Sequence, residues 1–216
     1  VKEPVVVAKL DQAGLLFLEN KGQWNPQALF GARTPGLNFW VTRDGVVMDS
    51  YQDVDYGPED TRRIGTVTAM EFVNPNPART SVGVTPAGPI TDFLKTGNSG
   101  RTRVRAAASY KEAYLKNVYP GIDFRNYIDK NQPRYDLVVA AGADPRQIVL
   151  NFRGANSIDV KQDGELLIYT STGVMRQKGL YAYQSQRGRE VSIPVRFAKV
   201  GPTQISFALG NYDRTK

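Results

Sequence analysis

The sequence of 216 residues contains neither cysteine nor histidine. Without cysteine the chain cannot form disulfides, thiolate nucleophiles or cysteine-ligated metal sites. Without histidine it lacks the usual general base, the usual zinc ligand and the side chain that titrates near neutral pH. A Ser-His-Asp triad is therefore excluded, and an enzyme built from this chain would have to use carboxylates, lysine, tyrosine or a hard metal ion.

Long hydrophobic runs are also missing, since no stretch approaches the roughly 18 apolar residues that cross a bilayer. The longest apolar runs, Pro4 to Ala8 and Leu137 to Ala141, have the length of β-strands. The first residues lack the charged start and apolar core of a signal peptide. We therefore expect no membrane span, and we expect a mature or excised fragment because the chain begins without methionine.

Basic residues exceed acidic ones, with 28 Lys and Arg against 21 Asp and Glu, so the net charge is +7. Such an excess favours anionic partners, such as a surface polysaccharide or another anionic polymer. No known nucleic-acid-binding motif accompanies the charge, so we do not expect nucleic acid to be the partner. The ordinary alternative is a soluble protein with a modest basic excess.

Apolar and polar residues alternate through most of the chain, which is the pattern of half-buried β-strands. Gln204 to Leu209, for example, places Ile205, Phe207 and Leu209 on one face. Turn signals separate such runs at intervals of about ten residues. They include Asp44-Gly45, Lys130 to Pro133, Asp163-Gly164 and Arg187-Gly188. This pattern predicts an all-β fold, an antiparallel β-sandwich.

The length suits a single β-rich domain over residues 1–216. The segment Lys95 to Gly100 has the composition of a linker, which leaves open two packed β lobes over residues 1–95 and 101–216. Helix signals are few. Tyr110 to Lys116 fits two helical turns and an extended strand about equally well.

Several short motifs follow one another along the chain. They are Phe17 to Gln23 (Phe-Leu-Glu-Asn-Lys-Gly-Gln), Phe30 to Arg33 with Gly36 and Phe39 to Thr42, Val118 to Asp123 (Val-Tyr-Pro-Gly-Ile-Asp), Tyr135 to Val139, Gly142 to Pro145, Phe152 to Ala155 and Phe207 to Asp213. The ordered set resembles an uncharacterised N-terminal domain that precedes β-propeller (SBBP-type) repeats in secreted and surface bacterial proteins.

This resemblance implies a part of a larger exported protein, located outside the cell or at the bacterial cell surface. It supplies no catalytic or binding residue, because none is established for the family. The family usually continues after the position of Asp213 into an apolar strand, so we expect either a missing last strand or a cut chain.

Carbohydrate contact is the first candidate chemistry, because Trp24, Trp40, Tyr127 and Tyr169 offer flat faces for sugar rings. Two consecutive strands carry polar residues at alternating positions, which a hairpin would bring together. These residues are Asp123, Arg125 and Tyr127 on the first strand and Arg134 and Asp136 on the second. The competing interpretation is an ion-paired outer sheet face, with the aromatic residues in the core.

A calcium site is the second candidate. Asp53, Asp55, Glu59 and Asp60 surround Gly57 in one acidic segment, and calcium favours oxygen ligands from a flexible loop. The spacing is not that of an EF-hand, and a solvated acidic loop is the alternative.

An anion site is the third candidate. Arg101, Arg103 and Arg105 share one face of an extended chain, and guanidinium groups suit phosphate, sulfate or carboxylate. A solvated strand face is the alternative.

We expect a non-catalytic extracellular structural or interaction module of adhesion type, whose partners are neighbouring domains of the same chain or a surface polymer. The alternative is a carbohydrate-binding or carbohydrate-active domain. A glycosidase needs only two carboxylates, so the lack of histidine does not exclude this alternative. Neither interpretation requires a cofactor, apart from the candidate Ca²⁺ site.

Overall fold

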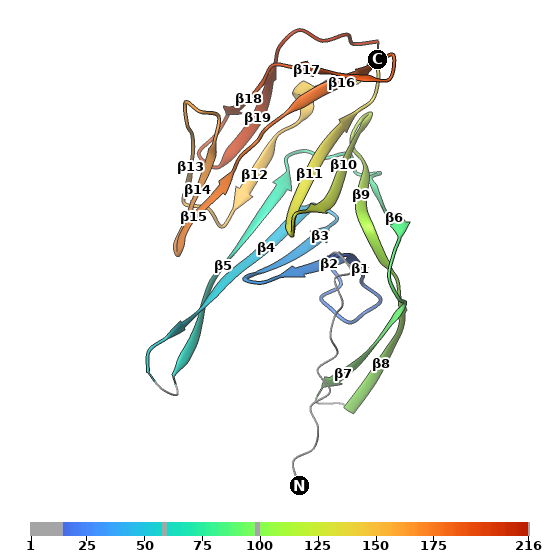
Figure 1. The fold of residues 1–216 in the computed structure, drawn as a ribbon, viewed down its shortest axis with the longest axis vertical. Helices are drawn as coiled ribbons and strands as arrows, with labels where there is room; N and C mark the ends of the chain where they lie inside the picture. The colour runs from blue at the N-terminus through green and yellow to red at the C-terminus, as the bar shows by residue number, and fades with distance from the viewer. Residues whose placement is uncertain (1–14, 58–59, 98–99, 216) are drawn as a thin grey trace.

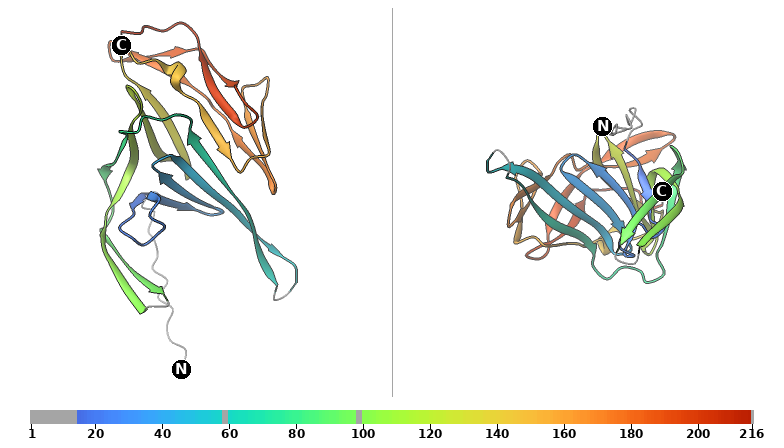
Figure 2. Two further views of the ribbon diagram at one scale, coloured as in Figure 1. Left: turned by 180° about the vertical axis from the view of Figure 1, so that it is seen from behind. Right: turned by 90° about the horizontal axis from the view of Figure 1, so that it is seen from below.

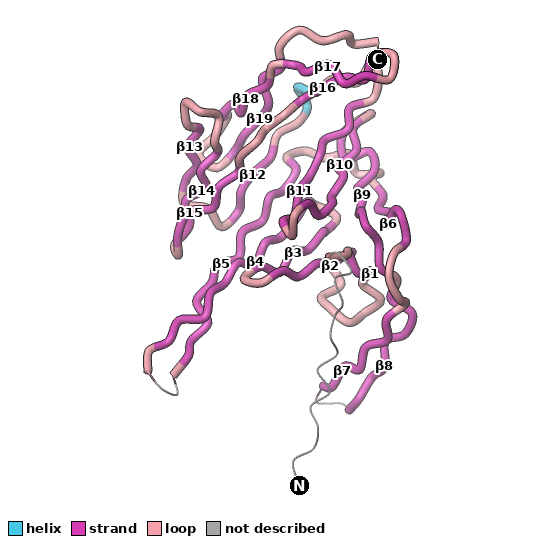
Figure 3. Tube along the Cα trace, viewed as in Figure 1, coloured by secondary structure: helices cyan, strands magenta, loops and turns pink. Residues whose placement is uncertain are grey.

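The computed structural model describes residues 15–57, 60–97 and 100–215, and of residues 94–97 and 100–105 it describes only the backbone. Strands make up the regular structure of this part of the chain, apart from one short 3-10 helix, η1 (Pro145–Gln147) (Figure 3). The strands pair in antiparallel fashion throughout, so the all-β antiparallel prediction is confirmed. No helix within the described ranges is long and apolar enough to span a membrane.

The largest sheet contains twelve strands, in the order β11-β10-β9-β1-β2-β3-β4-β5-β12-β19-β18, and β6 also pairs with β9 (Figure 1). These strands are β1 (Phe17–Glu19), β2 (Ala28–Thr34), β3 (Leu37–Thr42), β4 (Gly45–Asp55), β5 (Thr61–Phe72), β6 (Thr80–Pro86), β9 (Ser109–Tyr119), β10 (Ile122–Asp129), β11 (Gln132–Val139), β12 (Leu150–Arg153), β18 (Val195–Lys199) and β19 (Gln204–Leu209).

Three small sheets complete the fold. They are β7 (Thr91–Gly97) with β8 (Gly100–Ala107), β13 (Ser157–Val160) with β14 (Leu166–Thr170) and β15 (Gly173–Gln177), and β16 (Ala182–Gln186) with β17 (Arg189–Ile193). The hairpins β4–β5 and β7–β8 project away from the body of the molecule, as the view from behind shows (Figure 2).

Strand β9 connects two layers of the large sheet. Tyr110 near its start pairs with Phe17 of β1, whereas Tyr114 further along pairs with Arg125 of β10. Strand β6 runs along β9 past both positions. Because a strand has only two edges, β1 and β10 must follow one another along the same edge of β9.

The inward-facing side of β9 changes at this point. Tyr110 packs edge-to-face against Phe30 of the core, with ring centroids 6.0 Å apart. Ala113 and Leu115 have the opposite parity along the strand, yet both are fully buried. Strand β9 therefore turns a corner between layers, as strands do in sandwiches whose sheets cross at a large angle.

The two layers enclose one core. Phe72 of β5 and Phe124 of β10 are far apart in the strand order, but their rings meet edge-to-face with centroids 5.1 Å apart. Tyr119 of β9 also packs on Phe72, and its hydroxyl donates a hydrogen bond of 2.7 Å to the Val149 carbonyl. Burying each such aromatic side chain contributes roughly 1.5–3 kcal/mol. The sandwich thus arises from one large sheet that folds over its own core.

Turn chemistry explains where several strands end. Lys130 and Asn131 have φ of 48° and 62°, and Arg187 and Gly188 have φ of 51° and 76°. These values are those of type I′ turns, whose twist matches that of the strands in a hairpin. Of the predicted linker Lys95 to Gly100, the structure describes Lys95 to Gly97 as the end of β7 and Gly100 as the start of β8, and strands from both sides of it join the large sheet.

The Asp44-Gly45 hairpin forms, with its turn one residue earlier than that dipeptide predicts. Thr42 pairs with Gly45, so Arg43 and Asp44 are the turn residues. Gly45 has φ of 144°, and a Cβ there would lie 2.0 Å from the Met70 carbonyl oxygen. Close approach of two strands is therefore what requires glycine at this position. Tyr110 to Lys116 lies within β9, so the extended alternative is confirmed.

We expect Gly45→Ala to destabilise the fold by about 3 kcal/mol or more, because the added Cβ meets fixed backbone. Gly164→Ala is the matched control, since Gly164 also has positive φ (84°) but nothing within 4 Å of a Cβ. The control should lose only about 1–2 kcal/mol, the cost of a left-handed alanine. Urea unfolding of both variants measures the difference, and equal losses would contradict this account.

Candidate functional site

The polar residues predicted on β10 and β11 lie together on the outer face of the sheet. Arg125 pairs with Asp136 across the hairpin, and Tyr127 pairs with Arg134. Arg125 Nη1 donates to Asp136 Oδ2 at 3.1 Å, and the guanidinium carbon of Arg125 lies 4.6 Å from the Tyr127 ring centroid. The Tyr127 hydroxyl donates to Asp136 Oδ1 at 3.3 Å. The hairpin register therefore brings Arg125, Tyr127 and Asp136 into one network.

Strand β9 supplies a member of this network that the sequence analysis missed. Glu112 accepts two hydrogen bonds from Arg125, at 2.8 Å from Nε and 2.9 Å from Nη2. These bonds hold the pKa of the Glu112 carboxyl below its ordinary value. Asp123 accepts from Lys116 Nζ and from the Asn117 backbone N–H, both at 2.7 Å.

This arrangement has the chemistry of a structural ion network. A general acid in a glycosidase needs a carboxyl whose pKa is raised by its surroundings. The pKa of Glu112 moves in the opposite direction because the Arg125 guanidinium stabilises its charged form. The contacts thus match the competing interpretation, an ion-paired outer face.

Trp24 and Trp40 contact each other, but on other strands than the polar network. Trp40 lies on β3 and Trp24 on the loop between β1 and β2, and their rings meet edge-to-face with centroids 4.8 Å apart. Both rings cover Gly31 of β2, where a Cβ would come within 2.9 Å of each. The structure therefore divides the predicted carbohydrate-binding residues between two clusters, and Tyr169 lies in neither of them, on β14 of a separate sheet.

The side chain of Asn20 shapes the loop that carries Trp24. Its Nδ2 donates to the carbonyls of Asn25 and Ala28, at 2.9 and 2.7 Å. Its Oδ1 accepts from the backbone N–H groups of Gly22 and Trp24, at 3.0 and 3.2 Å. One amide thus binds four backbone groups of the loop, in the way that asparagine commonly stabilises turns.

Gln23 completes this clamp. Its Nε2 donates to the Glu19 carbonyl at 2.6 Å, and its Oε1 accepts from the Lys21 backbone N–H at 2.7 Å. The motif Phe-Leu-Glu-Asn-Lys-Gly-Gln therefore has a structural reason: Asn20 and Gln23 fix a loop that leaves the Trp24 indole half-buried. The spacing of these two amides was the sequence signal for this loop.

A groove of about 610 Å³ opens beside the Trp24 loop. Trp24 and Pro26 line it from the loop, Tyr110 from β9 and Ser81 to Gly83 from β6. The Tyr110 ring covers Gly83, where a Cβ would come within 2.4 Å of the ring. The volume lies within the range of roughly 300–1,000 Å³ that is typical of small-ligand sites.

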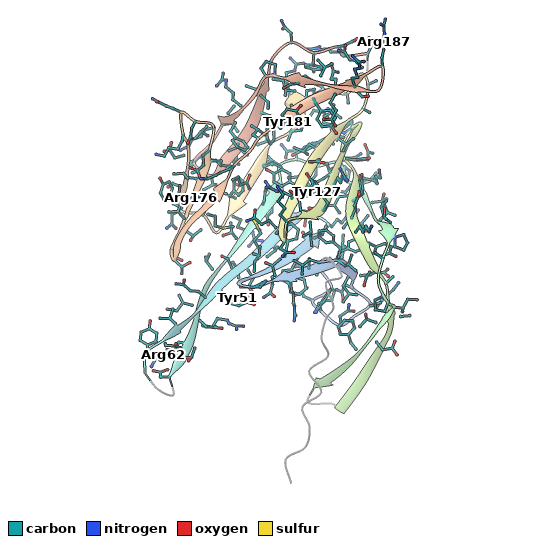
Figure 4. The ribbon with its side chains drawn as sticks, viewed as in Figure 1. Tyr51, Arg62, Tyr127, Arg176, Tyr181 and Arg187 are labelled. Atoms are coloured by element: carbon teal, nitrogen blue, oxygen red, sulfur yellow. The ribbon has the colours of Figure 1, made fainter. Side chains whose placement is uncertain are left out.

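The predicted calcium segment lies at the far end of the β4–β5 hairpin, near the labelled Arg62 (Figure 4). Each of its described carboxylates has a neighbour: Asp53 pairs with Arg63 at 2.9 Å, Asp55 accepts from the Thr61 hydroxyl at 2.6 Å, and Asp60 pairs with Arg62 at 2.7 Å. Glu59 lies outside the described residues. Within the described ranges no group of three acidic side chains is arranged to hold a metal, so calcium binding stays a prediction.

The predicted arginine stripe falls on β8. Arg101, Arg103 and Arg105 are in extended backbone, but their side chains lie outside the described residues. Ala106, directly after Arg105, has φ of 60° and marks a bulge opposite Asp92. Anion binding at this strand likewise stays a prediction.

An aromatic pair that was not predicted from the sequence lies at the opposite end of the molecule (Figure 4). Tyr181 and Tyr183 are 58% and 51% exposed, and their rings stack with centroids 5.7 Å apart. The same hairpin holds the C-terminal residues, since the Gln184 side chain forms two hydrogen bonds with the Asp213 backbone, at 2.6 and 2.8 Å. Tyr183 lies on β16 and Tyr181 directly precedes that strand, so the signal was the alternation that places both tyrosines on one face of an extended chain.

Comparison with protein-family models matches residues 17–216 to a family described as "Domain of unknown function (DUF7948)". The matched range covers all the short motifs of the sequence from Phe17 to Asp213. No curated protein and no solved structure matches the chain. The family description assigns no activity or ligand, so function has to be argued from the geometry.

We expect Glu112→Gln to lower the free energy of unfolding at pH 7 by about 1 kcal/mol, because Arg125 loses a charged partner. The folded-state pKa of Glu112 lies below its unfolded value of about 4.3, so this stabilisation is present above pH 5 and disappears as the pH falls below 4. Urea unfolding at pH 7 and pH 3 measures both values.

Asp159→Asn is the control for this experiment, because its pair with Lys161 leaves both side chains about half exposed. It should change stability much less than Glu112→Gln, because water screens an exposed ion pair. If Glu112→Gln were no more destabilising than this control at pH 7, the ion network would not be structural.

Proposed function

This chain belongs to the DUF7948 family, and from that premise we propose that it is a non-catalytic interaction module of a larger exported bacterial protein. In this proposal the module lies outside the cell or at the cell surface and docks a neighbouring domain of the same chain. Its resemblance to the domain that precedes β-propeller repeats supports such a neighbour. The stacked pair Tyr181 and Tyr183, beside the anchored C-terminal residues, is the observation that carries the proposal.

Exposed tyrosines in contact with one another favour a docking role. Water-facing strand positions usually carry polar side chains, whereas Tyr181 and Tyr183 are both more than half exposed. Tyrosine is enriched in protein interfaces because it offers a large apolar ring and a hydroxyl that still forms hydrogen bonds. A second domain covering this pair would remove apolar surface from water.

The hydrogen bonds that hold the C-terminal residues in place support the same role. Besides the Gln184–Asp213 hydrogen bonds, the Gly142 backbone N–H donates to the Arg214 carbonyl at 2.8 Å. Residues up to Thr215 are therefore held between the β16–β17 hairpin and the loop after β11 (Figure 1). A neighbour joined to a fixed segment has a high effective concentration at the tyrosine pair, which favours docking even when the contact alone is weak.

The acid–base groups of the outer face are consistent with a non-catalytic role. Glu112 and Asp136 both bind Arg125, and Asp123 binds Lys116. For Glu112, the Arg125 guanidinium holds the pKa of the carboxyl below its ordinary value, which makes it a poor proton donor at neutral pH.

Hydrogen–deuterium exchange tests the docking proposal. We expect the backbone amides of β16 and β17 to exchange more slowly in a longer protein that carries the proposed neighbouring domain than in this domain alone. Replacing both Tyr181 and Tyr183 by alanine should remove that difference, because the neighbour loses its contact. Exchange rates that are the same in both proteins would contradict docking at this hairpin.

Tyr56→Ala is the matched control for this experiment. Tyr56 is 59% exposed, as Tyr181 is, but it lies at the tip of the β4–β5 hairpin. The control should leave the exchange of β16 and β17 unchanged. If it removed the protection as well, the effect would be a general consequence of losing exposed tyrosine.

A further inference from the structure

We propose that the groove beside Trp24 binds a neutral glycan, with one pyranose ring between the Trp24 loop and strand β6. This site is separate from the tyrosine pair on β16, so it is independent of the docking proposal. The groove has walls of two kinds, aromatic rings and hydroxyl groups, and a sugar ring presents the same two kinds of surface. Trp24 and Tyr110 supply the rings.

Two free hydroxyl groups contribute to the polar part of the groove, which also includes Glu19 and Asn20. Within the described part of the chain, neither the Tyr110 hydroxyl nor the Ser81 hydroxyl forms a hydrogen bond to a protein group. Both are therefore open to the hydroxyls of a ligand. A few such groups in an otherwise apolar pocket are what fixes the orientation of a small ligand.

The charges around the groove favour a neutral ligand over an anionic one. Among the residues whose side chains the structure describes, the lining contains Glu19 but no lysine or arginine. Lys21 nearby is paired with the Glu19 carboxylate at 2.8 Å, so this pair adds no net charge. The described lining therefore offers a sulfated or uronic polymer no unpaired cationic partner, which favours a neutral ligand.

The Trp24 loop holds its indole in position before a ligand arrives. Asn20 and Gln23 fix the loop backbone, and the ring packs on Trp40 at 4.8 Å and on Phe93 at 6.2 Å between centroids. Binding to such a preformed surface loses little conformational entropy. The indole is nevertheless only half-buried, so part of its surface remains available to a ligand.

Tryptophan fluorescence tests this proposal, because Trp24 and Trp40 are the two tryptophans of the chain. In a Trp40→Phe background, Trp24 alone reports binding. The probes are four neutral hexasaccharides (of β-1,4-glucan, chitin, β-1,4-mannan and β-1,4-xylan), together with heparin and a proline-rich decapeptide. We expect at least one hexasaccharide to shift Trp24 emission saturably, with an affinity that does not change between 0.05 and 0.5 M salt.

Two conservative variants locate the site. Tyr110→Phe keeps the ring over Gly83 and removes only the hydroxyl, and Ser81→Ala removes the other free hydroxyl. Each should weaken binding about fivefold, as expected for one lost hydrogen bond. Tyr127→Phe on the β10 face is the matched control and should leave the affinity unchanged.

Three results would overturn the proposal. The first is no change in Trp24 emission with any hexasaccharide up to 10 mM. The second is a response to heparin or to the decapeptide alone, which would identify a different class of partner. The third is weaker binding with Tyr127→Phe but not with Tyr110→Phe, which would move the site to the β10 face. None of these results depends on the amide exchange of β16 and β17.

Discussion

The shared strand β9 is the constraint on which the rest of the structure depends. Its first residues pair with β1 and its later residues with β10, so the layer of β10 and β11 must lie across the core from β5. Only this arrangement allows Phe124 to reach Phe72. The apolar face of each layer would otherwise remain in water, at a cost of roughly 25 cal/mol for each Å² of apolar surface.

The same corner determines where polar chemistry can lie. On the outer face of β9, Glu112 reaches Arg125 on β10, and the two charges neutralise one another. At the corner itself Tyr110 faces Phe30 and leaves room for the groove. Charge pairing therefore dominates the flat face, whereas unpaired hydroxyls and aromatic rings remain at the bend. A binding site is better sought at the bend, because the Tyr110 and Ser81 hydroxyls there have no protein partner among the described residues.

Much of the fold was accessible from sequence because its signals are local. Alternation predicted the strands, and pairs such as Arg187-Gly188 predicted hairpins whose turn geometry the structure has. The register of β10 and β11 also followed from local pattern, so Arg125 and Asp136 were correctly expected to lie close together. The partner Glu112 was missed because it lies on a third strand, and single-sequence alternation does not reveal which strand adjoins which. For the same reason, the sequence did not show that Trp24 lies away from that network.

Two glycines show most clearly which features could not be predicted from local sequence patterns. Glycine within a strand costs roughly 0.5–1 kcal/mol relative to alanine, and Gly31 and Gly83 both carry that cost. In each case an aromatic ring covers the position where a Cβ would stand: Trp40 with Trp24 over Gly31, and Tyr110 over Gly83. Ring and backbone thus restore the missing contact, a compensation known for glycines in sheets. Both aromatic rings at the groove pack over such a glycine. The shape of the groove therefore depends on two residues without side chains, which the alternation of polar and apolar residues does not identify.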